Sequence, residues 1–297
     1  MFTAIGNQIR TRVLSRLGLE SAPVADLDGL RAVYAAWCVS VPFDNIAKLI
    51  ALRTASNTPL PGMDPSEFFE RWLDHGVGGT CWATANSLCE LLLAIGFNAR
   101  RVAGSMRDTG YIGHGSVKVR IEKIDWLVDS SMLTDVPLPL TNEVFIASNS
   151  VYGAEAEPAN GSHIVWADLP PNPTLIPCRL LMDPATPEFY VERYEASRLR
   201  SPFNERLYIR RNRPGARLVL DANTRIHKSA QAQHTDDLNR DGLCECLINE
   251  FNISSEMVDA WIRSGALDAS FAQPSTPTPA AITRLHPSAR NRPLNFR

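Results

Sequence analysis

The sequence Gly78-Gly79-Thr80-Cys81-Trp82 leads directly into a run of helical periodicity that extends to Ile95. Cys81 therefore stands at the predicted start of a helix, where backbone N–H groups and the positive end of the helix dipole favour a thiolate. The glycine pair allows a tight turn and leaves room for a substrate at the sulfur. The buried stripe and the stop of this predicted helix are Leu88, Leu91, Leu92, Ile95 and Gly96. An isolated cysteine is more often a small buried apolar residue, so Cys81 needs a neighbouring base to be a candidate nucleophile.

Two strand-like runs, residues 113–121 and 125–129, supply a base and an acid. If they form a hairpin around Glu122-Lys123, Ile121 faces Ile124 and Asp129 falls opposite Ser116. His114 then shares a face with Asp129 at a diagonal spacing of roughly 7–8 Å between backbones, close enough for a carboxylate to bond an imidazole N–H. Glu-Lys is a poor two-residue turn, and a loop one residue longer would move one partner to the other face. Taken alone, His114 is typical of a surface histidine and Asp129 of a strand-end turn residue.

Four motifs in this order resemble those of the arylamine N-acetyltransferases. They are Pro42-Phe43-Asp44-Asn45, Gly78 to Trp82, His114, and Trp126-Leu127-Val128-Asp129. Members of that family carry a Pro-Phe-Glu-Asn segment, a Gly-Gly-x-Cys nucleophile, a histidine and then an aspartate. The resemblance implies a catalytic triad of Cys81, His114 and Asp129, of the transglutaminase type. It extends over residues 10–265, through Ser201-Pro202-Phe203, Arg210 and the segments 215–220 and 243–251.

The chain departs from the family pattern around the implied pocket. Val77 stands where the family usually has arginine, and Ala83 where it usually has glutamate. Residues 130–133, Ser-Ser-Met-Leu, replace Val-Gly-Phe-Gly, so the pocket wall should differ in shape. Without an arginine at position 77, the Asp44 carboxylate must find another partner or be solvated. The candidate substrate-binding residues are Phe43, Ser130, Ser131 and Met132.

The sequence pattern changes from helical to strand-like near Phe97. Helices are expected after Asp26, from Asp64 to Gly76, and over residues 255–264, each preceded by a capping residue. Strands are expected at residues 99–105, 115–121, 125–129, 207–211 and 217–220. The resemblance implies an α+β fold with a transglutaminase-like cysteine-enzyme core. Its expected units are a helical bundle (1–96), a β-barrel (97–195), an α/β lid (196–271) and an irregular tail (272–297).

Composition narrows the classes of function. The 297 residues are 44% hydrophobic and carry a formal net charge of −2, which gives no electrostatic reason to expect nucleic acid or a membrane surface. Basic clusters such as Arg210-Arg211 and Arg213 are typical of solvated surface, or could meet a phosphate-bearing donor or an acidic carrier protein. We find no apolar run near the roughly 20 residues of a membrane span and no secretory pattern at Met1–Gln8. A cytoplasmic location is expected.

The six cysteines stand at positions 38, 81, 89, 178, 244 and 246. Because the chain is long and shows no secretory pattern, reduced thiols are expected rather than a disulfide framework. Cys244 and Cys246 are one residue apart with no further histidine or cysteine pair nearby, which is a poor zinc motif. No metal site and no tightly bound cofactor are therefore expected.

The resemblance implies a two-step acyl transfer. An acyl thioester, acetyl-coenzyme A in the family, acylates Cys81, and an amine such as an arylamine then takes the acyl group. The altered segment after Asp129 keeps a second reading open, an amide synthase that releases an acyl chain from a carrier protein. A thiol hydrolase shares the triad but not the C-terminal motifs. A binding protein with a dead triad is disfavoured because all three triad residues are present.

Overall fold

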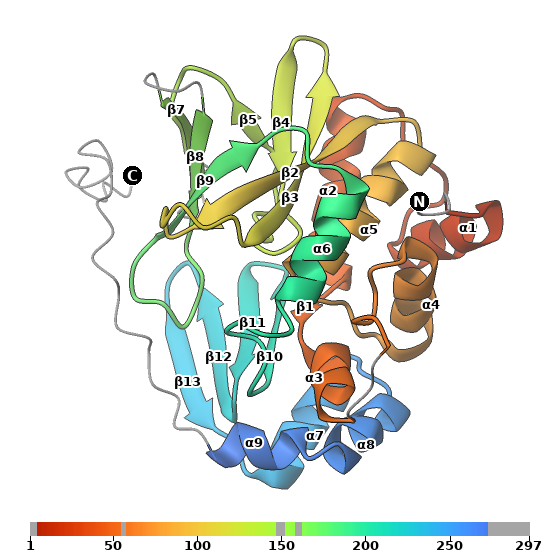
Figure 1. Cartoon of the computed structure of the whole chain (residues 1–297), viewed down its shortest axis with the longest axis vertical. Coiled ribbons are helices and arrows are strands. Elements are labelled where there is room, and N and C mark those ends of the chain that lie inside the picture. Colours follow the sequence, from red (N-terminus) through yellow and green to blue (C-terminus); the bar gives the residue numbers. More distant parts are fainter. Residues whose placement is uncertain (1–4, 55–57, 147–151, 158–161, 273–297) are drawn as a thin grey trace.

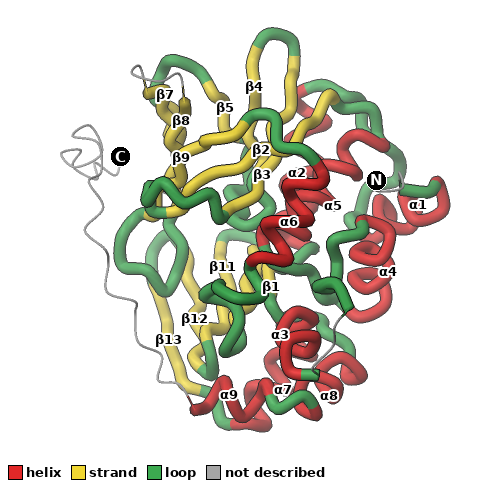
Figure 2. Tube along the Cα trace, viewed as in Figure 1, coloured by secondary structure: helices red, strands yellow, loops and turns green. Residues whose placement is uncertain are grey.

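The fold is α+β, with a helical layer, a curled eight-stranded sheet and a second sheet covered by helices (Figure 1). The computed structural model describes residues 5–54, 58–146, 152–157 and 162–272. Figure 2 shows the helices gathered on one side of the barrel-like sheet and at the far end of the smaller sheet. The expected tail from residue 273 onward lies outside the described residues.

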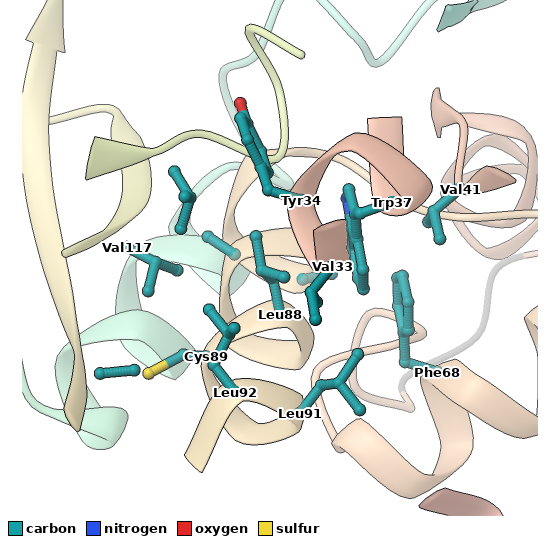
Figure 3. Close-up of a cluster of buried hydrophobic side chains, with 14 of the residues drawn as sticks. Val33, Tyr34, Trp37, Val41, Phe68, Leu88, Cys89, Leu91, Leu92 and Val117 are labelled. Atoms are coloured by element: carbon teal, nitrogen blue, oxygen red, sulfur yellow. The ribbon is translucent and has the colours of Figure 1, made fainter. Parts of the chain in front are cut away.

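The N-terminal helices pack around one hydrophobic core. They are α1 (Asn7–Arg16), α2 (Leu27–Ser40), α4 (Pro65–His75) and α5 (Cys81–Ala94). Side chains of α2, α4, α5 and the barrel strand at Val117 meet in this core (Figure 3). The expected boundaries are confirmed: the Asp26 carboxylate accepts from Gly29 N, the Asp64 carboxylate accepts from Ser66 N and Glu67 N, and Gly76 ends α4 at φ 78°.

The eight-stranded sheet is antiparallel throughout. In spatial order its strands are β5 (Leu138–Leu140), β4 (Ile124–Val128), β3 (His114–Ile121), β2 (Asn98–Met106), β9 (Ile176–Met182), β8 (Ser162–Ala167), β7 (Gly153–Glu157) and β6 (Phe145–Ile146). Strands β5 and β7 also come into contact, so the sheet curls into a nearly closed barrel. The expected barrel is thereby confirmed as part of the fold.

The hairpin of β3 and β4 has the expected register. Val117 pairs with Val128, and Ile121 pairs with Ile124. The two-residue turn Glu122-Lys123 forms although neither residue favours a positive φ. Glu122 adopts a φ of 51°, which costs a non-glycine residue conformational energy. Burial of the alternating apolar side chains on one face outweighs that cost.

The second sheet joins distant parts of the chain. Its order is β1 (Phe43–Asp44), β10 (Tyr208–Arg213), β11 (Ala216–Asp221), β12 (Thr224–Ser229) and β13 (Gln233–Asp237). Packed with it are α3 (Ile46–Arg53), α7 (Arg240–Asn249), α8 (Ser255–Arg263) and α9 (Ala266–Ala272). Both β1 and α3 lie within the expected 1–96 unit but pack with the C-terminal sheet, and α6 (Pro187–Ala196) packs on α5. The unit boundaries themselves remain a prediction.

Asp44 connects β1 to the turn before Cys81. Its carboxylate accepts from Ile46 N at 2.9 Å and from Gly78 N at 2.6 Å, and the residue is fully buried. Val77, where the family usually has arginine, is itself buried in the C-terminal core. The carboxylate has therefore found backbone donors in place of a side-chain cation. Burial raises its pKa to about 6, although the N–H groups of Gly78 and Ile46 act in the opposite direction.

We predict that Asp44→Asn changes the pH dependence of stability. Because the folded-state pKa, about 6, exceeds the ordinary value of 3.8, the folded state binds the proton more tightly. The contribution of Asp44 is fully present below pH 3.8 and is lost as the pH rises through 6. The unfolding free energy of the parent should fall by about 2–3 kcal/mol relative to Asp44→Asn across this window, measured by urea denaturation at several pH values. The exposed Asp28→Asn is the matched control, and a pH-independent difference for Asp44→Asn would contradict the prediction.

Candidate active site

Cys81 is the first residue of α5, as expected. Thr80 is the N-cap residue, and the Gly78-Gly79 turn brings the backbone against the segment at Pro42. A Cβ on Gly78 would lie 2.0 Å from Pro42 O, so glycine is required at 78 for this close approach. Neither Gly78 nor Gly79 adopts a positive φ, so the need for glycine is steric rather than conformational.

His114 and Asp129 form a buried hydrogen-bonded pair. His114 Nε2 lies 2.7 Å from Asp129 Oδ2, and both residues are almost completely buried. The other carboxylate oxygen, Oδ1, accepts from Ser131 N at 2.9 Å and from Met132 N at 2.8 Å. Burial alone would raise the pKa of Asp129, but the His114 charge and these donors hold it below its usual value. Asp129 is therefore ionised and fixed in orientation.

The imidazole of His114 connects Asp129 to Cys81. Burial lowers the pKa of His114, but the Asp129 charge and its hydrogen bond outweigh burial, so the pKa lies well above 6.5. The Cys81 side chain also raises the pKa of His114, and with Nε2 engaged by Asp129 the nitrogen left for Cys81 is Nδ1. The Cys81 thiol lies 3.8 Å from Gly113 O. The arrangement can hold an imidazolium beside a thiolate.

The other buried thiols differ from Cys81 in environment. Burial raises the pKa of Cys89 and of Cys178 to about 12, which keeps both as neutral thiols. Cys244 is partly exposed, and burial also raises its pKa. In the described residues, Cys81 is thus the cysteine that combines a helix start with a contact to the strand end at Gly113, next to His114.

Aromatic side chains hold α5 against the barrel. The Trp82 and Tyr190 rings meet edge to face with centroids 4.9 Å apart, and the Tyr190 hydroxyl hydrogen-bonds the carbonyls of Val102 and Ser116. A Cβ on Gly115 would lie 2.8 Å from the Trp82 ring. Because Gly115 follows His114, the absence of a side chain at position 115 lets the strand that carries His114 approach the helix that carries Cys81.

The structure separates the four candidate substrate-binding residues. Phe43 packs edge to face on Phe203, and the Ser130 hydroxyl donates to Thr84 Oγ1 at 2.8 Å. The Met132 side chain lies in the barrel core, while Ser131 retains a buried hydroxyl without a partner among the described residues. Ser130 and Met132 therefore contribute to holding the turn after Asp129, and the substrate role of all four residues remains a prediction.

The expectation of a solvated surface is wrong for Arg210. Asn212, on the same face of β10, donates to Leu133 O at 2.7 Å, so this face of the strand looks toward the turn after Asp129. Arg210 is 2% exposed, and its guanidinium has no hydrogen-bond or ion-pair partner in the described part of the chain. Arg211 points the other way and donates to Phe251 O and Glu250 O. The alternation of β10 explains why neighbouring arginines differ.

Two residues near the site were not identified from the sequence. The Tyr34 hydroxyl donates to Asp129 O at 2.8 Å and accepts from the backbone N–H groups of Asp129 and Thr134. Lys48 is buried, and its ammonium donates to Ser197 Oγ at 2.9 Å beside the Tyr194 ring. A tyrosine on the buried face of a helix needs a hydrogen-bond partner for its hydroxyl. A single lysine within the apolar run Ile46–Ile50 is unusual, because lysine is rarely buried. These two features of the sequence could have indicated that Tyr34 and Lys48 lie near the site.

The comparisons with known proteins agree on the kind of fold. Residues 26–150 match a family model described as N-acetyltransferase. An arylamine N-acetyltransferase of Mycolicibacterium smegmatis is 31% identical over 91 residues, which is 31% of this chain and 31% of that protein. The sequence match thus spans about a third of this curated relative.

Solved structures extend the likeness over most of the chain. A variant of the Mycobacterium smegmatis arylamine N-acetyltransferase superimposes with a TM-score of 0.74 at 19% identity, covering 86% of this chain and 98% of that one. The Salmonella typhimurium arylamine N-acetyltransferase superimposes with a TM-score of 0.72 at 17% identity, covering 89% of this chain and 100% of that one. The M. tuberculosis enzyme superimposes with a TM-score of 0.72 at 16% identity, covering 86% of this chain and 98% of that one. The fold is therefore that of an α+β N-acetyltransferase. Together the comparisons support the arylamine N-acetyltransferase family for this chain, and the resemblance seen in the motifs is confirmed.

Two further features concern the described residues only. None of their helices is both long and apolar enough to cross a membrane. Within the same ranges, no three histidine, cysteine, aspartate or glutamate side chains gather closely enough to hold a metal ion.

We predict that Asp129→Asn slows alkylation of Cys81 by iodoacetamide at pH 7 by at least about tenfold while the protein stays folded. The amide has no charge to stabilise the imidazolium, so the thiolate fraction near neutral pH falls. The measurement is the alkylation rate from pH 5 to 9, with circular dichroism to check the fold. Asp125→Asn is the matched control, because Asp125 pairs with Arg100 and Arg120 instead. An unchanged profile in Asp129→Asn would remove this carboxylate from the site.

Proposed function

We propose that the protein is an acyltransferase that moves an acyl group from a thioester, acetyl-coenzyme A in the first instance, through an acyl-Cys81 intermediate to an amine such as an arylamine. The observation that carries the proposal is the buried His114–Asp129 pair, 2.7 Å apart, together with the Cys81 thiol at the start of α5, which lies 3.8 Å from the carbonyl oxygen of Gly113, the residue before His114. The likeness to an N-acetyltransferase family model and to a curated arylamine N-acetyltransferase supports the acetyl group and the arylamine.

In the first half-reaction the Cys81 thiolate attacks the thioester carbonyl. A new carbon–sulfur bond forms, the old one breaks, and the departing thiolate takes the proton from the His114 imidazolium. Exchange of one thioester for another is nearly isoenergetic, so the site needs little driving force. The N–H groups of the first turn of α5 favour the negative charge on the sulfur.

In the second half-reaction the amine attacks the acyl-cysteine. The neutral imidazole accepts the amine proton, the carbon–sulfur bond breaks, and the thiolate and imidazolium are restored beside Asp129. Because Asp129 holds the ring by Nε2, the nitrogen that exchanges the proton stays directed at the sulfur through both steps. The His114 imidazole, held by Asp129, therefore serves as the acid in the first half-reaction and as the base in the second.

Arg210 supports a donor that carries anionic groups. Its guanidinium is buried without a partner in the described residues, on the strand face that looks toward the turn after Asp129. The neighbouring Tyr152 hydroxyl also lacks a partner there. A phosphate of coenzyme A, or of a carrier-bound phosphopantetheine, has the charge and acceptor oxygens that such donors need.

The acyl-enzyme is tested by intact mass. Incubation with acetyl-coenzyme A should add one acetyl group to the parent and none to Cys81→Ala, which should also lose acyl transfer to an arylamine. Cys244→Ala is the matched control and should be acylated like the parent. Faster iodoacetamide labelling of Cys89 or Cys178 than of Cys81 would contradict the proposal. An adduct from an acylated carrier protein, with none from acetyl-coenzyme A, would favour the amide synthase, whose motivation is the altered segment 130–133.

We predict that Arg210→Met raises the KM for acetyl-coenzyme A about tenfold or more, because charge-assisted hydrogen bonds to phosphate are lost. The KM for a truncated donor without phosphates, the acetyl thioester of N-acetylcysteamine, should stay unchanged. Arg211→Met, on the opposite strand face, is the control and should affect neither KM. Equal loss with both donors would mean that Arg210 acts on the fold rather than on the donor.

A further inference from the structure

The loop between β2 and β3 leads the chain to His114 and is anchored by arginines at two separate places. At its start, the Asp108 carboxylate accepts two hydrogen bonds of 2.6 Å from Arg179 of β9. Near its end, Ile112 O accepts from Nε of Arg193 at 3.1 Å and also from Nη2 of the same side chain. The second arginine belongs to α6 and not to the barrel. The loop is thus tied to α6 two residues before the candidate base.

The segment that Arg193 holds also touches the candidate nucleophile. The Cys81 thiol lies 3.8 Å from Gly113 O. Ile112, Gly113 and His114 are consecutive, and the peptide groups that join them are planar, so the place of one carbonyl constrains the next. A displacement of the Ile112 carbonyl therefore moves the Gly113 carbonyl and the imidazole relative to the thiol.

Two aromatic rings lie against the Arg193 guanidinium. Its central carbon is 4.9 Å from the centroid of the Tyr111 ring and 5.8 Å from that of the Phe189 ring. Phe189 in turn meets the Trp82 ring edge to face, with centroids 6.2 Å apart. Because Trp82 follows Cys81 in α5, the Arg193 side chain is connected both to the segment that carries the base and to the start of the helix that carries the thiol.

Helix α6 gives these contacts a fixed support. Tyr190 and Tyr194, on either side of Arg193, are almost completely buried, and their hydroxyls donate to backbone carbonyls of neighbouring segments. Arg193 is partly exposed, and no carboxylate pairs with it in the described ranges, so its donors serve Ile112 O. A charged donor makes a stronger hydrogen bond to a carbonyl than a neutral one does, so the side chain fixes this backbone atom.

We propose that Arg193 is a positioning residue of the active site. By holding the Ile112 carbonyl, its guanidinium keeps His114 and the Gly113 carbonyl in place against the Cys81 thiol. Arg193 acts through the backbone and not on the reacting atoms. The inference rests on the proposed function in that it takes Cys81 and His114 as a working pair. Position 193 lies outside the motifs that resemble the family.

This role predicts an effect that depends on pH. Near neutral pH an ordinary thiol, with a pKa of about 8.5, is mostly protonated, so the Cys81 thiolate depends on the imidazolium. Loss of the anchor should loosen His114 and lower the thiolate fraction in this range. At pH 9 most of the thiol is ionised with or without the histidine. A loop that merely became more open would instead change the reaction rate by the same factor at every pH.

The test is the rate of Cys81 alkylation by iodoacetamide from pH 5 to 9, with circular dichroism to check the fold. Arg193→Met keeps an unbranched side chain between the two rings and removes the donors. It should slow alkylation at pH 6.5 about tenfold and leave the rate at pH 9 within about threefold of the parent. Arg193→Lys keeps the charge and a donor for Ile112 O, and should recover most of the loss.

Tyr111→Leu provides a second variant should Arg193→Met fail to fold. It removes one of the two rings that hold the guanidinium, and because Tyr111 is 58% exposed the core is unaffected. The rate at pH 6.5 should fall in the same direction by less. Arg198→Met is the matched control, because Arg198 lies just beyond α6 and contacts Glu195 and Thr58 instead of the loop. Its profile should match the parent.

Three results would overturn the proposal: an Arg193→Met rate equal to the parent at pH 6.5, a fall by the same factor at pH 6.5 and pH 9, or a fall shared by Arg198→Met. The assay uses no acyl donor, so it is separate from the test of the proposed function. A parent that thioesters never acylate, but whose alkylation depends on Arg193 as described, would refute the function and leave this inference standing. A parent that acetyl-coenzyme A acylates, with an unchanged profile in Arg193→Met, would do the reverse.

Discussion

The structure around the site depends on one buried carboxylate, that of Asp129. One oxygen bonds His114 and the other accepts two backbone N–H groups of the turn that follows. The backbone of the same residue is held from α2 by the Tyr34 hydroxyl. Removing one partner of a buried charge pair typically costs about 3–5 kcal/mol, so each of these contacts constrains the others. The helical layer, the β3–β4 hairpin and the turn beyond it meet at this one group.

Buried charge is handled in two different ways in this protein. Asp44 is satisfied by backbone donors, which come with the fold, and Asp129 by His114 together with two backbone N–H groups. Lys48 and Arg210 are buried on the elements next to the site without carboxylate partners in the described residues. Buried charges without an opposite charge occur most often where a protein binds or reacts. The strand Phe43–Asp44 pairs with Arg210 on one side and with Gly79, in the turn before Cys81, on the other.

Much of the core could be predicted because its determinants are local. The capping residues Asp26 and Asp64 and the stop at Gly76 act within one helical turn. The β3–β4 register follows from the alternation of apolar side chains in the sequence, even though Glu122 is a poor turn residue. The short strands β5, β6 and β7 could not be predicted, because pairing with neighbours rather than their own composition makes them strands.

The sequence by itself determined the cysteine at a helix start, the hairpin with its histidine and aspartate, and the order of motifs that resembles the family. Each depends on residues close together in the chain, where spacing translates directly into geometry. Only the tertiary structure decided that Arg210 is buried rather than solvated, that Met132 belongs to the barrel core, and that Lys48 is buried against Tyr194 and Ser197. The reason is physical. Burial and charge pairing depend on which distant elements pack together, and β1, α3 and β10 meet only in the folded chain.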